Sequence, residues 1–106
     1  MLHAVVYSGN MRTVDLAIYA DTLAGEHAAL AARLEQAQSR LREAAIERDA
    51  RAHLPGQTVR ELELLGILGG IDERTARSEI RRLGRALDAV EQLQSWVESR
   101  LELSAA

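Results

Sequence analysis

The chain has 106 residues, 47% hydrophobic and 27% charged, so its composition fits one folded domain and excludes a disordered protein. Eighteen alanines and sixteen leucines against 3% aromatic residues favour helices and argue against an all-β fold. A net charge of −3 argues against nucleic-acid or anionic-membrane binding by the whole surface, and the absence of Cys excludes disulfides and thiolate metal sites.

The first ten residues, 1–10, form a short apolar stretch that we expect to be an N-terminal arm, with a short β-strand or a disordered tail as the alternatives. No basic residue precedes its apolar part, in contrast to a secretory signal peptide. No apolar run in the chain approaches the roughly 18–20 residues that cross a bilayer. These features predict a cytoplasmic protein that does not bind membranes.

One helical pattern runs from about residue 13 to about residue 54, where Pro55 and Gly56 end it. Its apolar positions alternate at spacings of four and three residues, as the d and a positions of a coiled coil do. The d series is Leu16, Leu23, Leu30, Ala37 and Ala44, and the a series is Ala20, His27, Leu34, Leu41 and Arg48. A parallel line of alanines predicts close contact with another helix: Ala17, Ala24, Ala31, Ala45 and Ala52.

Two further signals precede a second long helix. Thr58 and Glu61 have the spacing of a capping box, which predicts a short helix at about 59–68 that Gly69 and Gly70 end. Asp72 predicts the N-cap of a last helix over about 73–102. The seam of this helix is Ala76, Ile80, Leu83, Leu87, Val90, Gln94, Val97 and Leu101, and a second apolar line beside the seam is Ala86, Leu93, Trp96 and Leu103.

These elements predict an all-α protein with a single helical domain over residues 11–106. The two long helices form an antiparallel, coiled-coil-like hairpin with a short helical elbow between them. Because one partner helix covers only one seam, the second apolar line predicts a homodimer that forms a four-helix bundle. The alternative is that the short helix folds back over this line. The candidate interface residues are His27, Leu30, Leu34, Leu93, Trp96 and Val97.

Residue types that carry chemistry form no known site. The histidines His3, His27 and His53 are far apart, and none lies in a His-x-x-x-His or Glu-x-x-His pair. No serine lies in a nucleophile motif, and no Lys follows the glycine-rich segment 66–70 as it does in a phosphate loop. The sequence therefore predicts a protein that is not an enzyme and has no catalytic, metal or cofactor site.

The charge order of the last helix is the most informative feature. Residues 71–87 contain five arginines and three acidic residues, whereas residues 88–102 contain four acidic residues and one arginine. This order opposes the helix dipole, which favours acidic residues early and basic residues late. Arg77, Arg81 and Arg85 also form a row of like charges, which weakens an isolated helix. Neither feature stabilises the helix on its own, so both predict a binding partner for it.

Two partners fit this charge order. In the first, two copies of the last helix pair antiparallel, so that each basic half meets an acidic half. In the second, the basic patch of Arg74, Arg77, Arg81 and Arg85 binds DNA phosphates. Residues 71–83, Ile-Asp-Glu-Arg-Thr-Ala-Arg-Ser-Glu-Ile-Arg-Arg-Leu, resemble the turn and recognition helix of helix-turn-helix DNA-binding proteins. This resemblance implies that the helix at 59–68 is the first helix of the motif and that five residues face the major groove: Arg74, Thr75, Arg77, Ser78 and Arg81.

The sequence therefore predicts a non-enzymatic helical assembly or protein-interaction module, for which a homodimer is the first expectation and another protein partner the next. The alternative is a DNA-binding regulator that uses the arginine-rich segment 71–85. Nothing in the sequence names a pathway.

Overall fold

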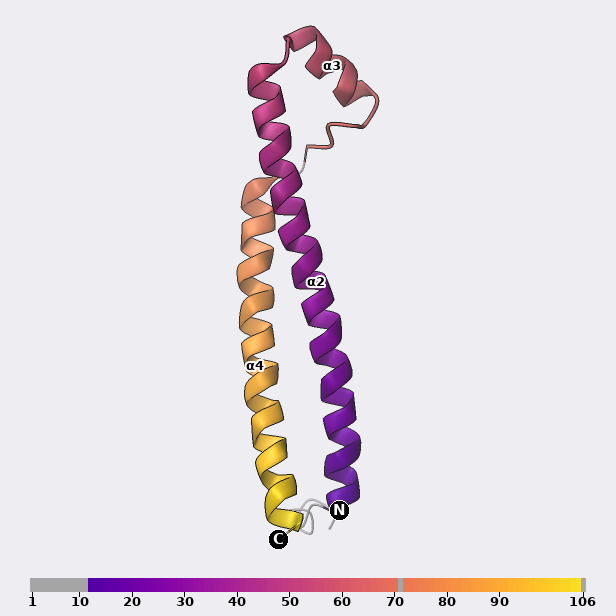
Figure 1. Cartoon of the computed structure of the whole chain (residues 1–106), viewed down its shortest axis with the longest axis vertical. Coiled ribbons are helices and arrows are strands. Elements are labelled where there is room, and N and C mark those ends of the chain that lie inside the picture. Colours follow the sequence, from indigo (N-terminus) through magenta and orange to yellow (C-terminus); the bar gives the residue numbers. More distant parts are fainter. Residues whose placement is uncertain (1–11, 71, 106) are drawn as a thin grey trace, which may run out of the picture. The chain divides into compact units, whose positions relative to one another are not determined.

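The computed structural model describes residues 12–70 and 72–105, and the expected N-terminal arm lies outside these residues. The described chain is all-α and consists of three helices, as predicted (Figure 1). They are α2 (Thr13–His53), α3 (Gly56–Leu64) and α4 (Glu73–Ala105). Within residues 12–70 and 72–105, no helix combines the length and the apolar character that a membrane span requires.

The long helices begin and end where their sequence provides partners for backbone groups. Asp72 caps α4: one carboxylate oxygen accepts a hydrogen bond from the Arg74 backbone N–H at 3.1 Å, and the other accepts one from the Thr75 hydroxyl at 2.8 Å. α2 ends just before Pro55, with Arg51 and His53 in its last turn, where positive charge favours the helix dipole.

The short helix differs from its prediction at both ends. It was expected at 59–68 with Thr58 as its cap, but α3 begins at Gly56 behind Pro55 and has no side-chain cap. It ends at Leu64 in a Schellman motif, because Gly66 has a φ of 75° and the Ile67 N–H donates to the Leu62 carbonyl at 2.9 Å. The glycine that ends this helix is therefore Gly66 and not Gly69.

The described chain divides into two compact units, which we call unit 1 (residues up to 31 and from 85) and unit 2 (residues 32–84). In unit 1 the first part of α2 packs antiparallel against the last part of α4, so that α2 begins where α4 ends (Figure 1). Its core is Leu16, Leu23 and Val97, with Ala20, Leu93 and Leu101 packed against them.

Unit 2 contains the end of α2, α3 and the start of α4. Its buried side chains are mostly small: Ala37, Ala44, Leu68, Ala76 and Leu83. Polar contacts hold the elbow to α2. Glu47 accepts hydrogen bonds from the backbone N–H groups of Gly69 and Gly70, both at 3.3 Å, and Arg51 forms ion pairs with Glu47 and Glu63. Close helix packing in this unit therefore comes from alanines, and the elbow is held by charge.

The predicted seams agree with the burial of the side chains. Four of the five d residues of α2 are buried, and Leu30 is half-buried. Four of the five a residues are half-buried, whereas Arg48 is exposed and binds Glu73 at 2.9 Å. The alanine line is less covered than predicted, because Ala17, Ala24 and Ala52 are exposed. A single partner helix therefore buries the seam of α2 but leaves part of the alanine line exposed to solvent.

Candidate functional site

The six candidate interface residues occupy different environments. Val97 is 1% exposed and belongs to the core of unit 1, so nearly all of its side chain is covered within the hairpin. Leu93 packs against that core. Leu30 and Leu34 are half-buried seam residues. Only Trp96 presents a large apolar surface, with 47% of it exposed. Most of the proposed interface residues are therefore used within the hairpin, because their apolar spacing is also that of the seam.

The second apolar line is partly open. Leu103 and Trp96 are exposed, whereas Ala86 and Leu93 are half-buried. The Arg100 guanidinium lies over the Trp96 ring, 5.7 Å from its centroid, within the range of a cation–π interaction. No described residue of unit 1 covers Trp96 and Leu103, so the second apolar line is partly exposed within this unit.

His27 bridges the two helices of unit 1. Its Nε2 atom lies 2.9 Å from a carboxylate oxygen of Glu91, and 34% of the histidine side chain is exposed. The imidazole at this a position therefore lies at the edge of the seam, where one of its nitrogens contacts the Glu91 carboxylate. The contact also pairs one residue of α2 with one of α4, which favours a single register of the two helices.

The basic patch is exposed along its length. Arg74, Arg77, Arg81 and Arg85 all face solvent. The Arg77 guanidinium lies 3.4 Å from a carboxylate oxygen of Glu73, and the same carboxylate also forms an ion pair with Arg48. The other three arginines of the patch make no ion pair with any described residue. The structure therefore brings the predicted residues together on one helix and leaves three of the four without a described ion pair.

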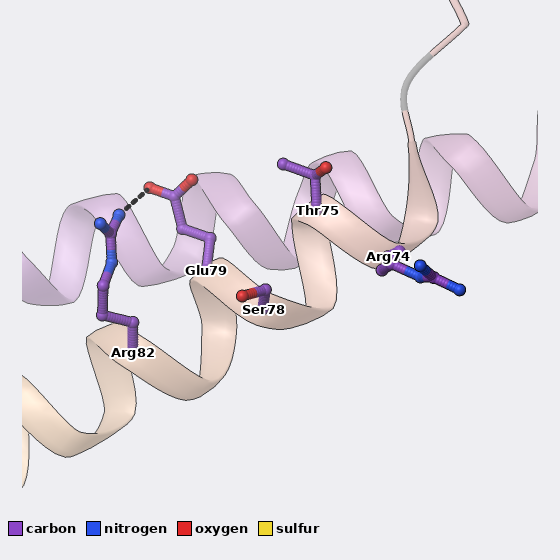
Figure 2. A pocket seen from close by; sticks show the side chains of 5 residues that line it. All are labelled: Arg74, Thr75, Ser78, Glu79 and Arg82. Carbon is purple, nitrogen blue, oxygen red and sulfur yellow. Dashed lines mark hydrogen bonds and ion pairs between the residues drawn. The ribbon is translucent and has the colours of Figure 1, made fainter.

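A shallow hollow of about 360 Å³ lies beside this patch. Its lining comes from one face of α4: Arg74, Thr75, Ser78, Glu79 and Arg82. Figure 2 shows Glu79 and Arg82 turned toward one another at 3.4 Å, while Arg74 points away from this pair. Hydrogen bonds from the Thr75 hydroxyl and the Arg74 backbone N–H hold the pKa of the adjacent Asp72 below its ordinary value of 3.8. Each end of this surface therefore carries one basic and one acidic side chain: Arg74 beside Asp72 at one end and Arg82 paired with Glu79 at the other.

A charged stripe runs along α4 next to the seam, and the sequence predicted the charge of both its ends but a row of named residues only at the basic end. Its members each follow a seam residue directly and keep the same spacing of four and three: Arg77, Arg81, Gly84, Asp88, Glu91, Ser95, Glu98 and Glu102. All are exposed except Gly84, which is half-buried. Positive charge lies at one end of this row and negative charge at the other. Applying the seam spacing one residue further along would have revealed it.

The pairing of α2 with α4 brings two acidic segments together in unit 1. The acidic part of α4 packs against a segment of α2 that holds three acidic residues and no arginine, and Arg12 directly precedes this segment. Unit 1 therefore has seven acidic residues and three arginines, a net charge of −4. Unit 2 has ten arginines and nine acidic residues, a net charge of +1. Folding of a single chain thus leaves the acidic half of α4 without a basic counterpart.

The turn before α4 differs from the one that the helix-turn-helix resemblance implies. Such motifs join their helices by three or four residues. Here α3 ends at Leu64 and α4 begins at Glu73, so eight residues separate them. The resemblance is therefore confined to the sequence of the first turns of α4.

Residues 12–70 and 72–105 contain no group of three His, Asp or Glu side chains placed to hold a metal ion. Comparison with protein-family models, with curated proteins and with solved structures finds no match to this chain. The surface chemistry of α4 is thus the basis for assigning a function.

Proposed function

We propose that this chain is a non-enzymatic, cytoplasmic assembly module whose α4 helices pair antiparallel in a homodimer. The observation that carries the proposal is the uncompensated charge of α4. Its acidic half lies in a unit of net charge −4, while Arg81 and Arg85 in its basic half have no described ion-pair partner. A second antiparallel copy supplies each half with the opposite charge.

A two-fold symmetric contact between two α4 helices can be stable even though each of its ion pairs is weak. One exposed ion pair contributes about 0.2–1 kcal/mol, which is too little to hold two chains together. In an isologous contact each pair forms twice, and the contributions add along the stripe. Apolar surface is also at hand, because the half-buried Ile80 lies between Arg77 and Gly84 on the helix surface, and Leu87 lies between Gly84 and Glu91.

Light scattering or sedimentation of the wild-type chain tests the proposal directly. We expect a dimer, and we expect the double variant Arg81→Glu/Arg85→Glu to raise the dissociation constant about tenfold or more, since reversal turns attraction into repulsion. Arg42→Glu/Arg60→Glu is the matched control, because both arginines are exposed, lack a described ion pair and give the same change in net charge. A monomeric wild type, or an equal effect of both double variants, contradicts the proposal.

DNA binding is the second candidate, and the exposed basic patch favours it. Phosphate contacts release counterions, so the affinity for DNA would fall steeply as the salt concentration rises. A mobility-shift assay with random duplex at about 50 mM salt is the test, with Arg74→Ala/Arg81→Ala as the comparison variant. Absence of a shift at this low salt concentration excludes this function.

A further inference from the structure

We infer that a hollow in unit 1 receives the Arg81 side chain of a second copy of this chain. The hollow has a volume of about 110 Å³ and is lined by Ala20, Leu23, Gln94, Val97 and Glu98. This inference rests on the proposed homodimer and deepens it, because it names the residue that each copy inserts into the other.

The hollow has the chemistry of an arginine receptor. Leu23 and Val97 are buried and give it an apolar floor, and the small side chain of Ala20 leaves the space open. The Glu98 carboxylate supplies negative charge at the exposed rim and forms no ion pair with a described residue. An arginine buries its aliphatic stem on such a floor while its guanidinium binds the carboxylate. The net charge of −4 on unit 1 favours the same guest.

The spacing of the charged stripe identifies Arg81 of the second copy as the side chain that enters the hollow. When two identical helices pair antiparallel about a two-fold axis, facing residue numbers have a constant sum. Only one register aligns the whole stripe with itself. It places Arg81 opposite Glu98 and Arg77 opposite Glu102, each twice per dimer. Arg81 is exposed and makes no ion pair with any described residue.

Gly84 is an independent sign of close approach on this side of α4. Apart from its sequence neighbours and the adjacent backbone of α4, nothing lies within 4 Å of where a methyl group at Gly84 would be, and the backbone there is helical. Glycine costs about 1 kcal/mol relative to alanine in a helix, so the hairpin itself gains nothing from it. In the register above Gly84 faces Ser95 of the second copy. Two small residues at this point let the helices come close enough for the arginines to reach the hollows.

A register one heptad shorter is the competing arrangement. It would place Arg81 opposite Glu91, but the Glu91 carboxylate already binds His27 at 2.9 Å. It would place Glu98 opposite Arg74 of the second copy, which continues the spacing of the stripe, and would leave only Glu102 without a partner. Both registers have two attractive pairs, and the full register adds one repulsive pair, Asp88 with Glu91 of the second copy. The contact of Glu91 with His27 is what favours the full register.

Charge-exchange variants test the pairing. We expect Arg81→Glu and Glu98→Arg each to raise the dimer dissociation constant about tenfold, because like charges then face each other. The double variant Arg81→Glu/Glu98→Arg restores the pair with its charges exchanged and should return the constant to within about threefold of wild type. Ala20→Leu fills the hollow and should weaken the dimer while the melting temperature of the monomer stays unchanged or rises. Circular dichroism of each variant verifies that it is folded.

The outcomes separate this inference from the proposed function. One outcome is that the wild-type chain dimerises and Arg81→Glu weakens the dimer, while Glu98→Arg fails to rescue it and Ala20→Leu has no effect. This result contradicts the binding of Arg81 in the hollow but is consistent with the homodimer. Rescue of Arg81→Glu by Glu91→Arg, and not by Glu98→Arg, shows the shorter register and also contradicts the binding of Arg81 in the hollow. A wild-type chain that stays monomeric up to about 1 mM removes both proposals.

Discussion

At the scale of single residues, Asp72 determines where the last helix begins. Its carboxylate accepts hydrogen bonds from the Arg74 N–H and the Thr75 hydroxyl, and these contacts lower its pKa. A lowered pKa in the folded state means that the ionised form stabilises the fold. The contribution is fully present above the ordinary pKa of 3.8 and is lost as the pH falls through the lower folded value.

We therefore expect Asp72→Ala to lower the melting temperature at pH 7, with a penalty that shrinks toward about pH 2, where both proteins lack the charge. Thermal unfolding followed by circular dichroism at several pH values measures this. Asp21→Ala is the control, because Asp21 is an exposed acidic residue on α2 with no described hydrogen bond. A penalty that persists unchanged at acidic pH would show that the carboxylate charge is irrelevant to the cap.

The cap at Asp72 followed from sequence because capping is local: the donor groups lie two and three residues away. Thr58 had an equally local signal, yet it lies inside α3 and caps nothing. Pro55 decided that case, because its φ of −58° is already that of a helix start and lets the chain begin the helix earlier. Two overlapping local signals cannot be ranked without the packing around them.

At the scale of elements, polar contacts hold the elbow to α2, and of its described apolar side chains only Leu68 is buried. Leu64, Leu65 and Ile67 are exposed, and α3 has no buried residue. Glu47 and Arg51 of α2 make the contacts that hold it: Glu47 binds two backbone N–H groups, and Arg51 binds Glu63. The Glu47 carboxylate, which accepts hydrogen bonds from two backbone amides, therefore constrains the turn before α4 together with the buried Leu68.

We expect Glu47→Ala to destabilise this elbow by about 1–3 kcal/mol, the cost of removing a charged hydrogen-bond acceptor. Amide hydrogen exchange of Gly69 and Gly70 should accelerate, while exchange in the core of unit 1 stays as it is. Glu43→Ala, which removes an exposed acidic residue of the same helix, should leave both rates unchanged. Equal exchange in the two variants would show that Glu47 does not hold the turn.

The seams of α2 and α4 followed from sequence because their periodicity repeats over many turns and each seam faces one partner. The elbow did not, since its contacts join residues far apart in the chain. Glu47 precedes Gly69 by 22 residues, and no periodic pattern connects them. The same limit applies to Val97. Its spacing marked it as apolar and in contact, but only the packing shows that the contact is within the hairpin.

At the scale of the whole molecule, the separation of charge between the units predicts two opposite responses to salt. Screening weakens repulsion among the seven acidic residues of unit 1, so the monomer should become more stable as salt rises. The proposed dimer depends on attraction between exposed charges, so its dissociation constant should rise over the same range.

Chemical denaturation at low protein concentration and sedimentation at high concentration, both between about 50 and 500 mM salt, measure the two trends. A dimer that tightens with salt would indicate an apolar contact, for which the second apolar line around Trp96 is the surface available. The charge separation itself is computable from sequence only after the hairpin pairing is known, because α2 and α4 each contribute to both units.

The position of Trp96 also has a spectroscopic consequence. It is the chain's one tryptophan, it lies in unit 1, and residues 32–84 contain no aromatic side chain. Intrinsic fluorescence therefore reports on unit 1 alone, whereas far-ultraviolet circular dichroism reports on the helices of both units. The native chain thus carries its own site-specific probe, and the two optical signals together reveal whether its two halves melt in one transition or in succession.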